Sequence, residues 1–260
     1  MPDSKLISKE ERHAAILERL MQFESVLVAG LAAMLNVSLV TIRKDLTELE
    51  KASKLYRSHG KAILMNPYIN NRNVSEKEKL YTTEKHNIGR EAAALICCDD
   101  SIILASGTTI HAFARQIKPV HKLTLITASI VAANVLSQEE DVEIVQLGGM
   151  LRHSSLSVVG RQAERYLEGV ACSKLFLGVD GIDFDFGITT TDIREAELNQ
   201  AMMRTAQKTI VLADSSKFGR RGFSKIAEIS DIDIIITDPG IPQSAITRLE
   251  ELGIDLIIAR

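Results

Sequence analysis

Short apolar segments that alternate with helical patterns fill the chain from Glu84 onward, and this alternation most restricts its fold. The first helical pattern carries Ile88, Ala92 and Leu95 on one face. The apolar segments are 102–105, 123–127, 142–147, 174–179, 209–213, 232–237 and 256–259, and helices are expected between most of them, as at 109–116, 193–206 and 243–252. Continuously apolar strands joined by helices predict an α/β domain with a mostly parallel sheet covered on both faces.

Polar residues and glycines follow several of these predicted strands, at the carboxyl ends where open α/β sheets bind ligands. Hydroxyls, carboxylates and cations therefore meet on one edge of a presumed single sheet. The residues are Ser106, Gly107, Thr108, Thr109, Thr127, Gly149, Arg152, Asp180 and Lys217. Their placement predicts a ligand site.

The segment from Ser106 to Thr109 suits a phosphate, because it stands where a strand gives way to a helix. Gly107 allows a close backbone approach, successive N–H groups point outward, and hydroxyls add donors. Lys217 would add positive charge, and Asp180 would accept hydrogen bonds from sugar hydroxyls. An ordinary helix cap with a turn glycine and a surface lysine remain the alternative interpretation of these residues.

The first 65 residues show a different pattern, that of three short helices. Ser8 is a cap for a helix that ends near Phe23, an extended piece at 26–28 follows, and a second helix covers about 29–35. Asn36-Val37 breaks that helix, and Ser38 caps a third helix. The inward face of the third helix carries Ile42, Leu46 and Leu49.

The opposite face of the third helix is polar and cationic, which is typical of a helix-turn-helix that enters the DNA major groove. Arg43 can contact guanine with two hydrogen bonds or grip phosphate, and Ser38, Thr41 and Lys44 can reach phosphates or base edges. Residues 54–64 then read as strand, turn and strand. This hairpin is a candidate wing that presents Arg57, His59 and Lys61. A three-helix scaffold with a solvated basic face is the alternative.

Charge supports the DNA interpretation only locally. The net charge is −3, yet residues 38–64 hold six basic and three acidic side chains, a cationic patch on a nearly neutral protein. At 260 residues the chain is long enough for two domains. We predict a winged helix-turn-helix domain at 1–65, a polar linker at 66–82 and an α/β sensor domain at 83–260.

Other classes of protein find little support. Cys97, Cys98 and Cys172 have no metal or disulfide spacing, and the six histidines are scattered, so we expect neither a metal nor another cofactor. The apolar runs fall short of the roughly 18 residues that a membrane span needs, and the N-terminus has no signal-peptide pattern. We therefore expect a cytoplasmic protein without a membrane partner.

The N-terminal motifs resemble the DNA-binding signature of the DeoR family of bacterial regulators. The matching residues run from Val37-Ser38 through Thr41-Ile42-Arg43-Lys44-Asp45-Leu46 and Leu49-Glu50 to Arg57-Ser58-His59-Gly60-Lys61-Ala62, preceded by Arg12, Ile16, Leu17 and Leu20. Two departures are Glu24-Ser25 in place of a glycine and Lys61 in place of the second glycine of the hairpin. Lys61 adds a cation at the wing tip.

The resemblance extends over the C-terminal domain, through Ser106–Thr109, Leu147–Gly160, Phe176–Thr190 and Asp214–Gly219. The family's sensor domain is similar to ribose-phosphate isomerases and glucosamine-phosphate deaminases. The resemblance implies that Ser106–Thr109 bind phosphate, that Asp180 and Lys217 face a sugar, and that Arg152 and Glu195 lie on the rim. Ala105 and Ala128 replace polar residues of the family pattern, so recognition of the sugar portion is expected to be unusual.

Together these features predict a sequence-specific DNA-binding transcriptional regulator of carbohydrate-metabolism genes, of the repressor type. Its expected partners are double-stranded operator DNA, a phosphorylated sugar effector and further copies of the chain in a dimer or tetramer. No catalytic residue is assigned. The alternative is a sugar-phosphate isomerase or deaminase with an accessory winged helix, for which Asp180, Asp183 and Lys217 would be candidate catalytic groups. A protein-interaction module is the third interpretation.

Overall fold

The computed structural model describes residues 7–23, 25–52, 54–58, 60–64, 74–119 and 121–260. The chain divides into two compact units, Met1–Asn66 and Pro67–Arg260. Each unit has its own hydrophobic core.

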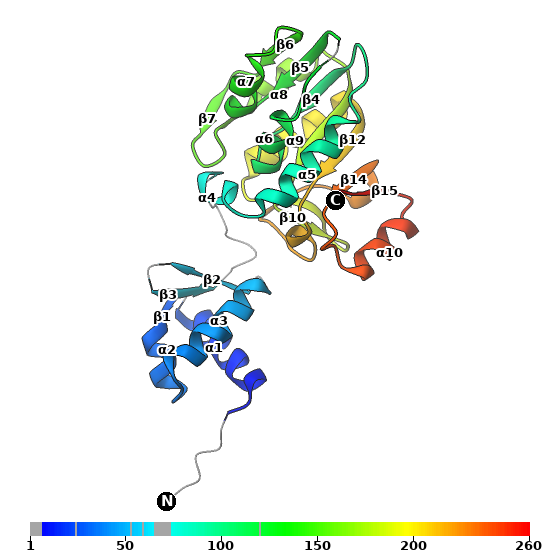
Figure 1. The fold of residues 1–260 in the computed structure, drawn as a ribbon. Coiled ribbons are helices and arrows are strands. Elements are labelled where there is room, and N and C mark those ends of the chain that lie inside the picture. Colours follow the sequence, from blue (N-terminus) through cyan, green and yellow to red (C-terminus); the bar gives the residue numbers. More distant parts are fainter. Residues whose placement is uncertain (1–6, 24, 53, 59, 65–73, 120) are drawn as a thin grey trace, which may run out of the picture. The chain divides into compact units, whose positions relative to one another are not determined.

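The described part of the N-terminal unit contains three helices and a small antiparallel sheet (Figure 1). The elements are α1 (Lys9–Phe23), β1 (Ser25–Leu27), α2 (Val28–Met34), α3 (Leu39–Lys51), β2 (Leu55–Ser58) and β3 (Lys61–Leu64). The strand β3 lies between β1 and β2 and pairs with both. The three helices and the hairpin expected from the sequence are confirmed, and the pairing of β1 with the hairpin is an addition.

Local hydrogen bonds explain where these helices begin and end. The backbone N–H of Glu11 donates to Ser8 Oγ at 3.2 Å and the N–H of Ser8 donates to Glu11 Oε2 at 2.8 Å, which is a capping box at the start of α1. At α3, Ser38 Oγ accepts from the Thr41 N–H at 3.1 Å. Asn36, between α2 and α3, has a φ of 51°, a left-handed conformation that asparagine tolerates.

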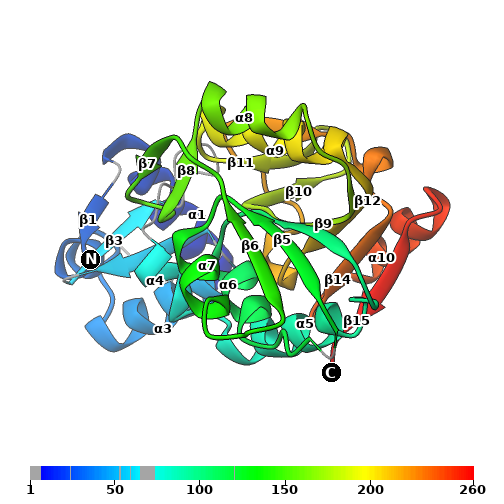
Figure 2. The same cartoon turned by 90° about the horizontal axis from the view of Figure 1, so that it is seen from above.

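The C-terminal unit is built on a seven-stranded parallel sheet (Figures 1 and 2). In spatial order its strands are β15 (Asp255–Ile258), β14 (Ile234–Thr237), β12 (Ala206–Leu212), β9 (Cys172–Gly178), β4 (Ser101–Leu104), β5 (Leu123–Thr127) and β6 (Val142–Gln146). Each of the seven apolar segments expected to be a strand forms one of these seven. The chain runs outward from β4 to β6 and then returns to β9 on the other side of β4, so the strand order reverses between β4 and β9.

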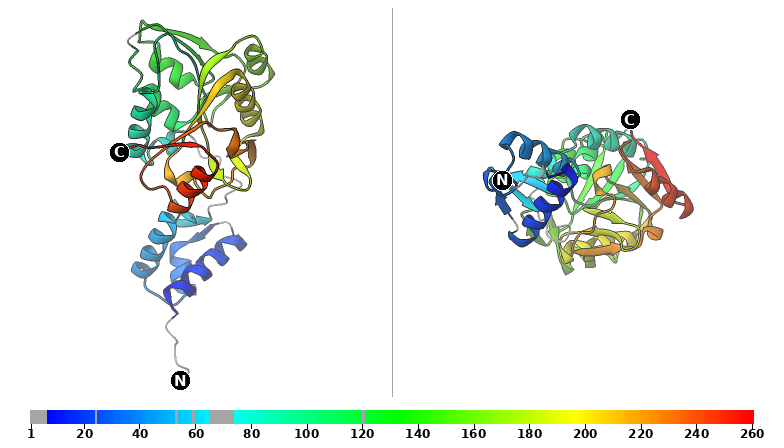
Figure 3. Two further views of the ribbon diagram at one scale, coloured as in Figure 1. Left: turned by 90° about the vertical axis from the view of Figure 1, so that its right-hand side faces the viewer. Right: turned by 90° about the horizontal axis from the view of Figure 1, so that it is seen from below.

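Helices cover both faces of this sheet, as Figures 2 and 3 show. One face packs against α5 (Thr82–Ala93), α6 (Thr108–Ala114) and α7 (Ile130–Leu136), and the other against α8 (Arg161–Leu167), α9 (Ile193–Thr205) and α10 (Gln243–Glu251). Alternate residues of β4 serve the two cores: Ile102 and Leu104 face α5 and α6, and Ile103 faces the opposite core. The covered parallel sheet predicted from the apolar strands is thereby confirmed.

Several short elements of the C-terminal unit were not expected. They are the hairpin of β7 (Met150–Arg152) and β8 (Ser157–Val159), the sheet of β10 (Gly181–Asp183), β11 (Gly187–Thr190) and β13 (Ser224–Ala227), and the helix α4 (Val74–Glu78). Strands of three or four residues are too short for a clear period in the sequence. The helix α4 lies inside the predicted linker, yet it belongs to the C-terminal unit.

None of the described helices combines the length and the apolar character that crossing a membrane would require.

Candidate functional site

The exposed face of α3 is the first candidate site. Arg43 and Lys44 are exposed there, and Val40 beside them is 75% exposed, while Ile42 and Leu46 on the other face are fully buried. A cationic face on one side and a core-packed face on the other fit a helix that can enter a groove.

The hydroxyls at the start of α3 are tied to the helix itself. Ser38 Oγ and Thr41 Oγ1 lie 2.8 Å apart, and Ser38 also caps the helix. Ser38 is exposed and Thr41 is half-buried. Both stand at the start of α3, within two turns of Arg43 and Lys44. The four residues expected to read DNA from α3 are therefore gathered at one end of the helix.

Asp45 does not weaken this cationic face, because its side chain turns into the core. Only 3% of that side chain is exposed, and Arg12 from α1 donates to both carboxylate oxygens, at 2.8 and 3.0 Å. Burial alone would raise the pKa of Asp45, but Arg12 and His13 hold it below its usual value. Asp45 is the one acidic residue of the segment 39–47, so its inward position keeps its charge away from the exposed face of α3. Glu48, one turn after Lys44, is partly exposed and pairs with Lys9 of α1 at 2.5 Å.

The hairpin cations differ from one another. Arg57 on β2 is held by Glu50 of α3, which accepts from its guanidinium at 2.6 and 2.9 Å and from its backbone N–H at 3.0 Å. Lys61 on β3 is exposed, with no ion-pair partner among the described residues. His59 lies outside the described residues. Lys61 is thus the more available wing cation, and Arg57 serves in part to fasten the hairpin to α3.

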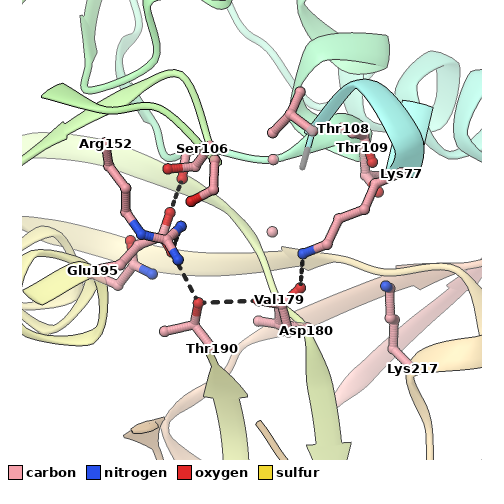
Figure 4. Close-up of a pocket in the computed structure, with 16 residues that line it drawn as sticks. Lys77, Ser106, Thr108, Thr109, Arg152, Val179, Asp180, Thr190, Glu195 and Lys217 are labelled. Carbon is pink, nitrogen blue, oxygen red and sulfur yellow. Dashed lines mark hydrogen bonds and ion pairs between the residues drawn. The ribbon is translucent and has the colours of Figure 1, made fainter. Parts of the chain in front are cut away.

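The second candidate site is a pocket of about 570 Å³, open to solvent, at the carboxyl ends of β4 and β9 (Figure 4). This is the point where the strand order reverses, the place at which open α/β sheets bind ligands. Eight of the ten residues predicted for the effector line it: Ser106, Gly107, Thr108, Thr109, Arg152, Asp180, Glu195 and Lys217.

Two predicted residues do not line this pocket. Thr127 is fully buried, donates to the Leu104 carbonyl at 2.8 Å and accepts from the Ser129 N–H at 3.0 Å, so it fixes the end of β5. Gly149 has a packing role, since a Cβ there would lie 2.7 Å from the Val159 carbonyl oxygen. The sequence criterion, a polar residue or a glycine directly after a predicted strand, does not distinguish Thr127 and Gly149 from residues that face the pocket.

Gly107 shapes the pocket wall through its backbone. Its φ is 119°, a region that favours glycine, and a Cβ built on it would meet no atom within 4 Å. Thr108 and Thr109 follow at the start of α6, and Figure 4 shows them above the cavity. The open side of this glycine leaves room for an anion against the backbone.

A buried network holds one side of the pocket. Glu195 Oε1 accepts from Ser106 Oγ at 2.8 Å, while Oε2 accepts from Arg152 Nη1 at 3.1 Å and from Thr190 Oγ1 at 3.2 Å. Arg152 also lies 3.3 Å from Asp192. The charge of Arg152 is balanced by two carboxylates, so this residue and Glu195 brace the wall. Thr190 and Asp192, which complete the network, were not predicted as site residues.

The other side of the pocket holds a carboxylate between two lysines. Asp180 lies 2.6 Å from the Lys77 ammonium, and Figure 4 shows Lys217 pointing toward the same region. Burial alone would raise the pKa of Asp180, but Lys77, Lys217 and a hydrogen bond from Thr190 hold it below its usual value. Lys77 was missed because the run Glu76-Lys77-Glu78-Lys79 looks like a solvated linker.

Among the cations that line this pocket, Lys217 is the one that no described carboxylate pairs with. Its ammonium has no hydrogen-bond or ion-pair partner in the part of the chain that the structure describes. Burial lowers its pKa, although Asp214 and Asp180 oppose the shift. Since Glu195 and Asp192 balance Arg152, the charged groups left in the lining are Lys77 and Lys217 against Asp180, and this end of the pocket suits an anion.

Residues that would support other chemistry lie elsewhere. Asp183, a candidate catalytic group for an enzyme, is outside the pocket lining and pairs with Arg221 at 2.7 Å. Ala105 and Ala128 are buried in an apolar cluster rather than on the rim. Among the described residues no group of three or more histidine, cysteine or acidic side chains is placed to hold a metal.

Comparison with known proteins assigns both units. A DeoR-like helix-turn-helix domain matches residues 12–67, and the DeoR C-terminal sensor domain matches residues 81–239.

Several transcriptional regulators are similar over nearly their whole length. A protein of Escherichia coli O157:H7 named "Putative aga operon transcriptional repressor" is 38% identical over 98% of this chain and 96% of its own. The HTH-type transcriptional repressor GlcR of Bacillus subtilis (strain 168) is 35% identical over 96% of each chain. The glycerol-3-phosphate regulon repressor of Haemophilus influenzae is 30% identical over 95% of this chain and 96% of its own.

Among solved structures, a ribose 5-phosphate isomerase A from Methanocaldococcus jannaschii superposes on 52% of this chain and 53% of its own, with a TM-score of 0.37 and 18% identity.

Proposed function

Because the chain belongs to the DeoR family of transcriptional regulators, we propose that α3 reads operator DNA and that the pocket binds a phosphorylated sugar or polyol that controls this binding. Its close relatives are transcriptional regulators, not enzymes. The single observation that carries the effector proposal is the Lys217 ammonium, which faces the pocket without a counter-ion among the described residues.

In the DNA complex, Arg43 would contact guanine or phosphate, and Ser38, Thr41 and Lys44 would reach phosphates or base edges from the start of α3. Lys61, with His59 and Arg57, would contact the backbone from the hairpin. The support is the exposed cationic face of α3, from which Asp45 is withdrawn by Arg12.

In the effector complex, the backbone at Gly107 and the hydroxyls of Thr108 and Thr109 would hold the phosphate, and Lys217 would balance its charge. Asp180 would accept hydrogen bonds from hydroxyl groups of the carbon skeleton. Ser106, Arg152 and Glu195 would keep the wall rigid through their mutual hydrogen bonds. A relative named for the glycerol-3-phosphate regulon is consistent with this class of effector.

We further propose that the effector lowers the affinity for the operator, so that the chain acts as a repressor. An effector changes DNA affinity only if it prefers one arrangement of the protein over another. Helix-turn-helix proteins present two recognition helices about 34–36 Å apart, one turn of DNA, so a dimer or a tetramer is proposed. Binding to chromosomal operators would place the protein in the cytoplasm.

A two-step experiment tests this function. The full chain is first screened by thermal shift against inorganic phosphate, hexose 6-phosphates, pentose 5-phosphates and glycerol 3-phosphate. Compounds that stabilise it are then added to its complex with operator DNA selected from a random-sequence pool. We expect at least one phosphorylated compound to stabilise the protein and to release the DNA. Stabilisation by the unphosphorylated sugar alone would contradict the proposal.

A further inference from the structure

Lys77 enters the effector pocket from α4, which is the first described element after the winged unit in the chain. Its ammonium reaches Asp180 Oδ1 at 2.6 Å, and only 23% of its side chain is exposed. Figure 4 shows the side chain reaching into the pocket, where its ammonium meets Asp180. A residue from the start of the C-terminal unit, in the segment predicted to be a linker, is therefore part of the pocket lining.

The helix α4 is also fastened to the walls of the pocket. Glu78 Oε1 lies 3.3 Å from Nδ1 of His111, a fully buried residue on α6. The N–H of Val74 donates to the Ser154 carbonyl, in the turn between β7 and β8, at 2.9 Å. Lys85 donates from its ammonium to the carbonyls of Lys77 and Leu80, both at 2.6 Å. These contacts link α4 to α6, to the β7–β8 turn and to α5, so α4 cannot shift without changing them.

The charges around Lys77 make it available to an anion. An ammonium has three N–H donors, and the structure gives Lys77 one hydrogen-bond acceptor among the described residues, Asp180. Lys217 faces the same carboxylate and has no partner of its own there. A phosphate that enters beside Thr108 therefore meets two ammonium groups that share a single carboxylate.

This inference rests on the proposed function. We propose that Lys77 gives up its contact with Asp180 when the effector binds and contacts the phosphate of the effector instead. The resulting change in α4 would then be transmitted along the chain toward the N-terminal unit. Two arrangements of α4 follow, one held by Asp180 and one held by the effector. Residues 65–73 connect α4 to β3 in the chain, so the element that senses the phosphate lies next in sequence to the wing.

The test uses the full chain with inorganic phosphate as the probe, measured by calorimetry. Lys77→Gln removes the ammonium and Lys77→Arg keeps a cation. Lys79→Gln is the matched control, because Lys79 is exposed on the same segment and lies outside the pocket lining. We expect Lys77→Gln to weaken phosphate binding by about tenfold or more, the loss of one charge-assisted hydrogen bond. Lys77→Arg and Lys79→Gln should stay within about threefold of the wild type.

Hydrogen–deuterium exchange, followed in the wild type and in the two glutamine variants, gives a second readout. Phosphate should slow amide exchange across residues 75–80 in the wild type and in Lys79→Gln, and should leave it unchanged in Lys77→Gln. Unchanged exchange of this segment in the phosphate-bound wild type would overturn the role of α4.

The outcomes separate this inference from the proposed function. If Thr108→Val loses phosphate binding while Lys77→Gln binds as tightly as Lys79→Gln, the role of Lys77 is wrong and the effector pocket stands. If the wild type does not bind phosphate, or Thr108→Val binds it as well as the wild type, the pocket proposal and this inference fail together.

Discussion

Lys85 shows how one buried cation makes the stability of the C-terminal unit depend on pH. The residue is 5% exposed, and its ammonium is held by two backbone carbonyls near the end of α4. Burial lowers its pKa from 10.5 to about 8, with Asp214 opposing the shift and Lys217 and Lys77 adding to it. The protonated form is therefore less favourable in the folded chain than in the unfolded chain.

This shift predicts that stability rises with pH in a defined window. Below pH 8 Lys85 is protonated in the folded and in the unfolded chain, and the full cost of burying its charge lowers the stability. Between pH 8 and 10.5 Lys85 loses its proton in the folded chain but keeps it in the unfolded chain, so the free energy of unfolding rises with pH. The free energy of unfolding of the wild type should rise by up to about 3 kcal/mol relative to Lys85→Met across that window. Urea unfolding of both proteins at pH 7.5 and 10 measures it, and a constant difference would refute it.

Gly107 supports a second prediction at the residue scale. Gly107→Ala introduces no clash, since a Cβ there has no neighbour within 4 Å, but it strains a backbone with φ of 119°. We expect the free energy of unfolding to fall by about 1–3 kcal/mol and phosphate affinity to decrease. Gly169→Ala is the control, because Gly169 lacks a positive φ and its Cβ would make an ordinary contact at 3.9 Å. Equal behaviour of the two variants would contradict the role of Gly107.

At the scale of elements, the Arg12–Asp45 pair joins α1 to α3 and so positions the helix that we propose reads DNA. Asp45 is 3% exposed at its side chain, and Arg12 supplies both of its guanidinium contacts from the facing helix. A buried carboxylate that loses its only bidentate partner is costly, more so than the pair is stabilising.

Arg12→Met should therefore destabilise the N-terminal unit by about 3–5 kcal/mol. Arg12→Met combined with Asp45→Leu should recover most of that loss, since no unpaired charge remains buried. Lys54→Met, a change at an exposed cation with no ion pair among the described residues, is the control. Chemical unfolding followed by circular dichroism tests the series. If Arg12→Met is as stable as Lys54→Met, the pair does not hold the two helices together.

The elements also show which structure the sequence could predict. The inner strands of the parallel sheet contain continuous apolar runs because they are buried on both faces, whereas the edge strands β6 and β15 are only partly buried. Their spatial order was not predictable, because local patterns do not say which strands become neighbours. The helix α4 was not predicted, because its charged residues are typical of a solvent-exposed linker. Lys77 and Glu78 find their partners, Asp180 and His111, only in the folded chain.

The candidate site was predictable to a similar degree. Strand-end position and residue type found Ser106 to Thr109, Asp180 and Lys217, because parallel strands place their carboxyl ends on one edge. The same criterion also selected Thr127 and Gly149, which lie outside the pocket lining and serve β5 and the β7–β8 hairpin. Thr190 and Asp192 escaped notice because their role depends on contacts with Arg152 and Glu195 that only the fold creates.

For the whole molecule, the account requires that two separate sites control one activity. DNA binding should depend on α3 and effector binding on the pocket, so substitutions in the two units should have separable effects. Arg43→Ala removes a group able to form two hydrogen bonds with guanine, worth about 1–3 kcal/mol, so operator affinity should fall by about tenfold or more. Lys51→Ala, at the exposed C-terminal end of α3, should change affinity little.

The measurement that tests this most directly is the operator dissociation constant with and without a saturating, stabilising sugar phosphate. In the wild type the compound should weaken operator binding by about fivefold or more. Thr108→Val should bind the operator normally but show no response to the compound, while Arg43→Ala should lose operator binding and keep its thermal stabilisation by the compound. Operator binding by Arg43→Ala as tight as that of the wild type would contradict the account.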